Sequence, residues 1–472
     1  MNAAVIAQTP LVAAFALLLV LGASPKDRAP LASALVAVFG LLASAALVWL
    51  RLEPGDTFFG GAYLVTGVGK ALAVLCLGLT AAAVALGHGY LEKVRARATD
   101  WRIVVLALAM GLLSLCLAGD LATLFIAFEL ISIPSYVLCG FSLRDPRANE
   151  AGIKYLLLGA VGSVLFLLGL GFLYGATGEI ALPAIAEKLA EANAGTLAVA
   201  KLALGFVLAA LFFKTAVAPF HLWLADVYQG SSFAALSVVA SPVKVAVFGL
   251  LFTLLHGPFA SLEETWKPAL YACAAASAVI GNVQALAQKQ LRRLFAYSAV
   301  VNGAFILLTV AARSPQAFLF YVSAYGLMGL GLWAAFMALG TPHADVDELD
   351  DLRGLSGRHP LAALGLSVIV LSYAGLPLTA GFTAKFAAVV ASVRDAGSGS
   401  LALTVVIVAL VASVASFAYY FQILRHLWLV PLPEGSQALA RHMRPNQLVV
   451  FALVVGLLLT LSFLLPLPAL FG

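Results

Sequence analysis

Runs of about twenty mostly apolar residues recur along nearly the whole chain. A bilayer core about 30 Å thick is crossed by a helix of about 20 such residues, whereas a transmembrane β-strand needs only about half as many. Hydrophobic residues make up 63% of the 472-residue sequence and charged residues only 10%, against about 25% charged residues in soluble domains. The sequence therefore predicts an all-α polytopic membrane protein.

About fourteen transmembrane helices are predicted from these runs. Their extents are 9–23, 30–50, 66–88, 101–118, 120–141, 151–175, 197–225, 232–256, 268–288, 291–312, 316–340, 360–393, 400–424 and 446–468. The region 101–141 is nearly continuous, and the pair Gly119–Asp120 is the only break signal between the fourth span and the fifth. The segment 184–192 has the pattern of a short amphipathic surface helix. Because no connection is long enough for a soluble domain, residues 1–472 are predicted to form a single membrane domain.

Basic residues are concentrated in alternate connections between the spans. The odd-numbered connections hold Lys26, Arg28, Lys93, Arg95, Arg97, Arg102, Arg144, Arg147, Lys154, Lys289, Arg292, Arg293, Arg353, Arg358, Arg425, Arg441 and Arg444. Cytoplasmic loops carry the excess of lysine and arginine, so these connections are predicted to face the cytoplasm. In a bacterial inner membrane both termini would then lie on the periplasmic side.

Proline interrupts two predicted spans at corresponding positions. Pro219 breaks the seventh span and Pro377 breaks the twelfth, and each broken span also carries a lysine. A proline inside a helix frees backbone groups, which in lipid must find partners in protein or water. Paired broken helices are typical of inverted repeats around a path through the membrane. We therefore predict two inverted five-helix repeats, formed by spans 4–8 and 9–13. The expected organisation is 1–100 for spans 1–3, 101–256 for the first repeat, 268–425 for the second repeat and 446–468 for the final span.

Four charged side chains lie in the middle of apolar runs: Glu129, Lys214, Lys244 and Lys385. A charge at the bilayer centre costs roughly 2.5–3.5 kcal/mol on insertion scales, so such residues are rare and usually mark pathways for ions or protons. The structural alternative for the lysines is snorkelling to an interface. For Glu129 it is a pairing with a lysine that only holds two helices together.

Glu129 and Lys214 are the expected partners, because both lie mid-span within the first repeat. An opposite charge favours the protonated amine, whereas removal from water favours the neutral amine. Weakening the pair would therefore release a proton, so the pair could act as a switch.

The other candidates near the interruptions each follow a proline. Lys244 lies two residues after Pro242, where a distorted helix start leaves polar backbone and water to solvate the charge. Lys385 follows Pro377 by eight residues, about two turns, and is expected deeper in the broken span. His221 either relays protons near neutral pH or is a neutral core histidine bonded to a freed carbonyl.

Several polar groups are predicted to support such a path. Tyr297, Ser298 and Asn302 on the tenth span would order water, or else make ordinary interhelical hydrogen bonds. Lys154 and Glu150 form a pair expected at the membrane interface, although Lys154 could reach the region of the buried glutamate. The acidic run 345–360 could attract protons or contact a neighbour, but is expected to be a solvated loop.

Other chemistries find little support in the sequence. The four cysteines, Cys76, Cys116, Cys139 and Cys273, are far apart and lie in apolar segments, which is typical of small buried hydrophobic residues. No closely spaced metal-ligand cluster and no glycine-rich nucleotide loop after a strand is present. Basic residues fall in loops without an aromatic stacking platform, so nucleic-acid binding is not expected.

The segments around these residues resemble the antiporter-like membrane subunits of proton-pumping NADH:quinone oxidoreductase, respiratory complex I. The resemblance covers nearly the whole chain and is strongest from about residue 118 to 390. The segments that carry it are GDLATLFIAFELISIPSYVL, EAGIKYLLLGA, LFFKTAVAPFHLWLADVYQGS, SPVKVAVF, GNVQALAQKQLRRLFAYSAV, DLRGLSGRHP and GLPLTAGFTAKF. Within the family, VYQG after the broken helix and a lysine at position 385 resemble the branch called subunit N.

The resemblance implies a role for each matched residue. Glu129 would pair with Lys214, Lys244 would be the central relay, and Lys385 would govern the far half-channel. Related subunits often have histidine where this chain has Asn302, and asparagine cannot titrate, so a water chain would have to pass this point. The resemblance also implies that NADH, FMN, iron–sulfur clusters and quinone belong to partner subunits and that this chain holds no cofactor. The expected partners are other membrane subunits of complex I, including related antiporter-like subunits.

The predicted function is translocation of protons through a chain of buried charged residues, driven by quinone reduction elsewhere in the complex. A second hypothesis is a subunit of an Mrp-type cation/proton antiporter or of a membrane-bound hydrogenase, which share the fold and much of the lysine pattern. A sodium carrier would be expected to show further carboxylates near the path, and only Glu129 is found. A purely structural scaffold does not explain two broken helices with buried lysines.

Overall fold

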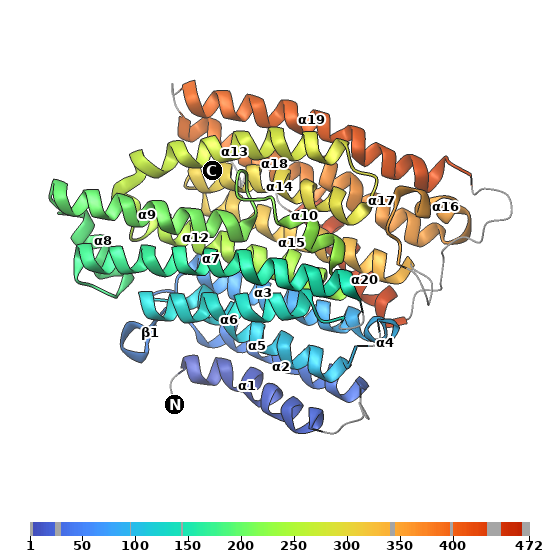
Figure 1. Ribbon diagram of the computed structural model, residues 1–472, viewed down its shortest axis with the longest axis horizontal. Helices are drawn as coiled ribbons and strands as arrows, with labels where there is room; N and C mark the ends of the chain where they lie inside the picture. The colour runs from blue at the N-terminus through green and yellow to red at the C-terminus, as the bar shows by residue number, and fades with distance from the viewer. Residues whose placement is uncertain are drawn as a thin grey trace.

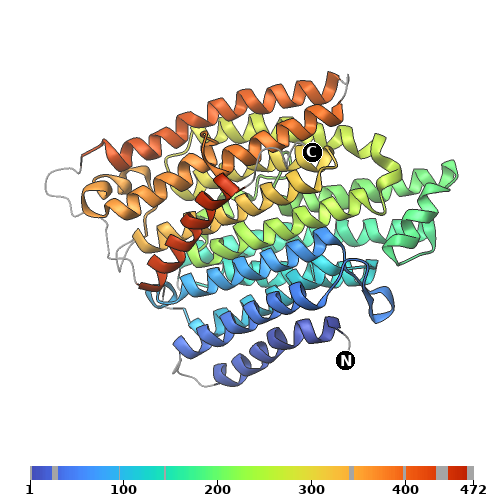
Figure 2. The same cartoon turned by 180° about the vertical axis from the view of Figure 1, so that it is seen from behind.

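The computed structural model describes residues 3–23, 30–94, 96–142, 145–339, 345–396, 400–431 and 445–464. Its helices run side by side along one direction, with α1 at one edge of the bundle and α19 at the opposite edge (Figure 1, Figure 2). The longer helices are α1 (Ala3–Gly22), α2 (Pro30–Arg51), α3 (Gly67–Gly87), α5 (Ala98–Leu117), α6 (Leu121–Cys139), α7 (Pro146–Thr177), α9 (Ala194–Thr215), α12 (Lys244–His256), α13 (Glu263–Leu286), α14 (Leu291–Ala311), α15 (Pro315–Leu339), α17 (Pro360–Ala374), α18 (Ala380–Ala396), α19 (Ser400–Trp428) and α20 (Pro445–Leu464).

Several short helices accompany the long ones, and one of them begins the buried segment Phe233–His256. They are α4 (Tyr90–Lys93), α8 (Leu182–Ala190), α10 (Leu224–Gly230), α11 (Phe233–Val238) and α16 (Leu355–Arg358). A two-stranded antiparallel hairpin, β1 (Thr57–Phe58) with β2 (Tyr63–Leu64), was not expected from the sequence. The helices α4 and α16 lie at one end of the bundle, whereas β1 and α8 lie at the other (Figure 1). The predicted surface helix at 184–192 is confirmed as α8.

Twelve helical segments of the described residues are long and apolar enough to cross a membrane, which confirms a polytopic helical membrane protein. The two other predicted spans correspond to shorter apolar helices. The span 360–393 is divided into α17 and α18, and the long apolar part of α20 covers Phe451–Ser462. Some predictions fall outside the described residues: Lys26, Arg28, Arg95, Arg144, Arg441, Arg444 and the end of the last span.

The predicted boundary between the fourth and fifth spans is confirmed. The helix α5 ends at Leu117 and α6 begins at Leu121. The Asp120 side chain accepts a hydrogen bond from the backbone N–H of Thr123 at 2.6 Å, which satisfies one of the free donors at the start of α6. A single capping residue thus divides a nearly continuous apolar stretch into two helices.

The interior of the bundle consists of helices that are apolar on every side. The segment Phe233–His256 and the helices α14 and α15 are almost wholly buried, whereas α1 and α19 expose most of their surface. A helix that is hydrophobic all round packs in a core or spans a membrane. The buried lysine of α12 and the polar residues of α14 are therefore enclosed by protein on all sides.

Backbone irregularities occur at each of the three predicted proline positions. After α9, Ala216 has a left-handed backbone (φ 58°) and the chain remains non-helical until α10 begins at Leu224. After α17, Gly375 is left-handed (φ 81°) and α18 begins at Ala380. Pro242 lies in a π-helical turn, Val239–Val243, immediately before α12. These breaks leave free backbone groups inside the bundle, where polar side chains can reach them.

Candidate functional site

Lys214 lies in the last turn of α9 and is 2% exposed. Its ammonium donates a hydrogen bond to the Ser132 hydroxyl on α6 at 3.0 Å. Three aromatic rings also face it, with centroids 4.7 Å away for Tyr136, 5.1 Å for Tyr155 and 5.7 Å for Phe128. The negative end of the α9 dipole and the aromatic faces both stabilise a cation at this place.

Glu129 does not form the direct ion pair with Lys214 that the sequence predicted. No described carboxylate lies within 4.0 Å of the Lys214 ammonium, and Glu129 Oε1 is buried without a hydrogen-bond partner. The two charges interact through space over a longer distance. The Lys214 ammonium is bonded instead to the Ser132 hydroxyl, which itself donates to the Phe128 carbonyl at 2.6 Å.

Lys244 is the first residue of α12, directly after the π-helical turn that contains Pro242. It is 2% exposed, and its ammonium has no hydrogen-bond partner among the described residues. The only aromatic contact found for it there is the Tyr228 ring of α10, at 5.7 Å. An unpartnered charge in this position is costly unless water reaches it.

Lys385 lies on α18 but caps the end of α17. Its ammonium donates to the backbone carbonyls of Tyr373 and Ala374, both at 3.0 Å, and to the Ser413 hydroxyl of α19 at 3.1 Å. The last carbonyls of a helix have no partner within the helix and carry partial negative charge. The break at Gly375 therefore creates the acceptor site that holds the Lys385 charge.

His221 follows the cis peptide bond between Ala218 and Pro219. Its Nε2 is 2.8 Å from the Gln284 side-chain oxygen on α13, so the partner is a side chain and not the freed carbonyl that the sequence suggested. The backbone at this break has other partners. The Trp223 indole donates to the Phe213 carbonyl at 3.0 Å, and the Ala218 N–H donates to a serine hydroxyl of α13.

Asn302 and Tyr297 are both buried on α14. The Asn302 amide donates to the Ser298 carbonyl at 2.9 Å, and its oxygen accepts from the Tyr321 hydroxyl at 3.1 Å. The Ser298 hydroxyl lies 2.5 Å from the Tyr420 hydroxyl of α19. Asn302 thus belongs to an interhelical hydrogen-bond network.

Sequence reasoning missed most residues that surround the buried lysines. Besides Ser132, they include the buried tyrosines Tyr136 and Tyr155 beside Lys214, Tyr228 beside Lys244 and Tyr373 beside Lys385. A buried tyrosine usually needs a partner for its hydroxyl. Tyrosine in the middle of an apolar span was therefore the available signal.

Lys154 forms ion pairs with Glu150 at 2.7 Å and with Asp226 at 3.4 Å, so it does not turn toward the buried glutamate. Asp226, at the start of α10, also binds Arg293 at 2.7 Å. Partial burial acts to raise the pKa of Asp226, but the hydrogen bond from Arg293 and the charge of Lys154 outweigh it, so this pKa lies below its usual range. These charges join α7, α10 and α14 at the end where the basic connections lie.

The acidic run is more than a solvated loop. Asp345 and Asp347 bind Arg292 at 2.7 and 3.2 Å, and the Tyr90 hydroxyl donates to Asp345 at 2.8 Å. Burial and the Asp345 charge raise the pKa of Tyr90 well above its usual value. A polar cavity of about 380 Å³ adjoins these groups and reaches Ser231.

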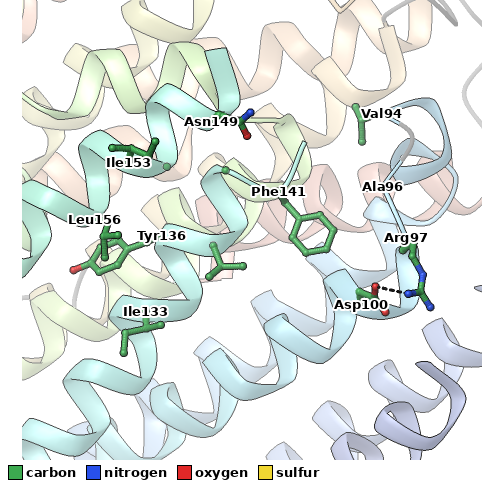
Figure 3. Close-up of a pocket in the computed structure, with 13 residues that line it drawn as sticks. Val94, Ala96, Arg97, Asp100, Ile133, Tyr136, Phe141, Asn149, Ile153 and Leu156 are labelled. Carbon is green, nitrogen blue, oxygen red and sulfur yellow. Dashed lines mark ion pairs between the residues drawn. The ribbon is translucent and has the colours of Figure 1, made fainter. Parts of the chain in front are cut away.

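A larger groove of about 800 Å³ lies between the start of α5, the end of α6 and the start of α7. Figure 3 shows the apolar side chains of Ile133, Ile153 and Leu156 beside Tyr136, with the ion pair of Arg97 and Asp100 at the other end. Tyr136 therefore separates this groove from Lys214, which its ring contacts on the inner side.

The described residues contain no group of three or more His, Cys, Asp or Glu side chains that could hold a metal ion. The arrangement instead offers isolated cations within a buried polar network. Such cations can gain or lose a proton, and their hydroxyl neighbours can both donate and accept one.

These features define a class of protein: a polytopic helical membrane protein with ionisable side chains buried at breaks in its helices. The family described as "NADH:quinone oxidoreductase/Mrp antiporter, TM" matches residues 118–416. The chain belongs to this family, and the resemblance seen in the sequence is confirmed.

Curated relatives and solved structures agree with this assignment. NAD(P)H-quinone oxidoreductase subunit 2 of Rippkaea orientalis is 34% identical over 450 residues, covering 94% of this chain and 85% of the relative. NADH-quinone oxidoreductase subunit N of Desulfovibrio desulfuricans is 33% identical, covering 86% and 82%. A chain of respiratory complex I from Thermus thermophilus matches with a TM-score of 0.82 and 31% identity, covering 98% of this chain and 99% of that chain. A chain of the Mrp complex from Dietzia shares the fold at 21% identity, with a TM-score of 0.81.

Proposed function

We propose that this chain is a membrane subunit of a proton-translocating NADH:quinone oxidoreductase and that it moves protons across a bacterial inner membrane. The observation that carries the proposal is the set of three lysines, Lys214, Lys244 and Lys385, each almost fully buried beside an interruption of a helix. The relatives at 31–34% identity are oxidoreductase subunits, whereas the Mrp match at 21% supports only the fold. The oxidoreductase assignment is therefore favoured over an antiporter.

Lys214 would be the switch of the first half of the chain. Its ammonium is held by Ser132 and three aromatic rings, while Glu129 acts on it from a greater distance. A partner subunit that drew Glu129 away would remove the field that favours the charged amine, and the proton would then leave. Movement of Glu129 toward Lys214 would have the opposite effect.

Lys244 would receive the proton in the middle of the bundle, and Lys385 would release it at the second break. Lys385 is bound by the carbonyl end of α17, so its charge is stabilised there without a counter-ion. NADH, FMN, iron–sulfur clusters and quinone would be bound by partner subunits, and their reaction would drive the movement of Glu129. The partners would be other membrane subunits of the complex, including related antiporter-like subunits.

The proposed topology has fourteen crossings in a single membrane domain, with both termini periplasmic. The first repeat would run from α5 to α12 and the second, inverted, from α13 to α19. Two features support this division: the broken pairs α9–α10 and α17–α18 each occupy the fourth place of five, and the basic ion-pair clusters gather at one end.

The decisive experiment measures protons pumped per NADH oxidised by the assembled complex in proteoliposomes. Lys214→Met and Glu129→Gln are expected to reduce or abolish pumping while the complex still assembles. Lys201→Met is the matched control, because Lys201 lies on the same helix α9 but is exposed. Wild-type stoichiometry in Lys214→Met would refute the proposed function.

A further inference from the structure

Among the described residues, no hydrogen bond or ion pair joins Lys244 to Lys385. Lys244 touches the Tyr228 ring, and Lys385 is bound at the far break by the Tyr373 carbonyl. Asn302, which lies in the network between them, has an amide that neither gains nor loses a proton near neutral pH. A different kind of group must therefore carry the proton across this part of the protein.

Five buried tyrosines lie around the two lysines, with the Tyr228 ring against Lys244 and the Tyr373 carbonyl bound to Lys385. They come from four helices and are 1–4% exposed: Tyr228 of α10, Tyr321 and Tyr325 of α15, Tyr373 of α17 and Tyr420 of α19. The rings of Tyr373 and Tyr420 are 6.3 Å apart, and the Phe305 ring links Tyr321, at 6.3 Å, to the Lys385 ammonium, at 5.4 Å. The cluster therefore reaches both lysines.

Two hydrogen bonds between helices organise the hydroxyls of this cluster. The hydroxyls of Tyr420 and Ser298 are 2.5 Å apart, and either of them can be the donor. The Tyr321 hydroxyl donates to Asn302, whose amide in turn binds the Ser298 carbonyl. Asn302 thus fixes the turn of α14 that presents Ser298 to Tyr420.

We propose that the hydroxyl pair of Tyr420 and Ser298 relays the proton between Lys244 and Lys385, and that Asn302 is the positioning residue that holds the pair in place. This inference rests on the proposed function. A hydroxyl oxygen accepts one proton while the hydroxyl releases its own to the next acceptor. The ammonium of Lys244 becomes an amine, the amine of Lys385 becomes an ammonium, and each hydroxyl ends with one proton, so no tyrosinate is formed.

Water would complete the relay at its Lys244 end. The Tyr228 hydroxyl and the Lys244 ammonium are both buried and have no hydrogen-bond partner among the described residues. Buried polar atoms of this kind are usually satisfied by ordered water. The Lys244 ammonium lies 5.7 Å from the centre of the Tyr228 ring, so water near these two side chains would join the tyrosine cluster to the lysine.

The test compares variants that remove a hydroxyl without removing the packing. Tyr420→Phe keeps the ring, and Ser298→Ala removes the other member of the pair. Both are expected to slow proton pumping about a hundredfold or more in proteoliposomes, because a positioned proton-transfer group is lost. Ser298→Thr, which keeps a hydroxyl, is expected to restore pumping. Tyr271→Phe is the control, since Tyr271 is a buried tyrosine of α13 whose hydroxyl has no hydrogen-bond partner in the described part of the chain and which is no part of the cluster.

The outcomes separate this inference from the proposed function. Lys244→Met and Lys385→Met are measured in the same assay. If the lysine variants lose pumping while Tyr420→Phe and Ser298→Ala pump like wild type, the hydroxyl relay is wrong and the proposed function stands. If the lysine variants also pump like wild type, the proposed function itself fails. If the complex with Tyr420→Phe does not assemble, Ser298→Ala is compared with Ser298→Thr. Equal pumping by these two variants refutes the hydroxyl relay.

Discussion

Gly375 is the residue on which the position of the Lys385 charge depends most directly. It is left-handed (φ 81°), and a Cβ added there would lie 2.9 Å from Cδ and 3.2 Å from Nζ of Lys385. Gly375→Ala therefore pushes the lysine away from the carbonyls of α17. Gly178, at the end of α7, is also left-handed (φ 71°), but its added Cβ would meet no atom within 4 Å. Gly178→Ala is thus a matched control that measures only the cost of placing an alanine in a left-handed backbone.

The two substitutions share one cost and differ in another. A left-handed backbone costs an L-residue roughly 1–2 kcal/mol, and both variants carry this cost. Only Gly375→Ala also disturbs the three hydrogen bonds of the Lys385 ammonium, which lie at 3.0–3.1 Å. A hydrogen bond to a charged group contributes about 1.5–3 kcal/mol, so the loss of one should roughly double the destabilisation.

Proton pumping and thermal stability of the assembled complex measure the difference. Gly178→Ala should lower the unfolding temperature slightly and leave the number of protons pumped per NADH unchanged. Gly375→Ala should lower both, because the lysine no longer rests on the carbonyl end of α17. If the two variants gave the same pumping and the same unfolding temperature, the break at Gly375 would not be what holds the Lys385 charge in place.

Two further predictions use matched pairs on the same structure. Ser132 and Ser135 are both fully buried and both bond to a carbonyl four residues earlier, but only Ser132 accepts from Lys214. Ser132→Ala should therefore slow proton pumping, because the buried Lys214 ammonium loses a hydrogen bond of about 1.5–3 kcal/mol. Ser135→Ala should leave pumping unchanged. Equal pumping by the two variants would contradict the role of Ser132 as the partner of Lys214. Arg292→Ala should destabilise the complex by about 3 kcal/mol in a denaturation assay, because two partly buried aspartates lose their partner. Arg353→Ala, which breaks an exposed pair, should cost no more than about 1 kcal/mol, and a similar loss in both variants would rule out a special role for the Arg292 cluster.

Several features of the fold could be predicted because they depend on neighbouring residues in the sequence. The length of apolar runs determined most helices, and Asp120 ended one apolar stretch and capped the next. Proline and glycine determined where helices break. The cost of a charge in lipid singled out Glu129 and the three lysines.

The tertiary structure alone decided what these charges touch. Lys214 binds Ser132, 82 residues away, and Tyr420 binds Ser298, 122 residues away. In a membrane protein the lipid-facing and buried sides of a helix are both apolar, so the sequence carries little periodicity to show which residues face inward. The sequence could therefore name the buried charges, but the packing of helices determined that a serine and three aromatic rings surround Lys214. It also determined that Asn302, Ser298 and tyrosine hydroxyls form one buried hydrogen-bond network.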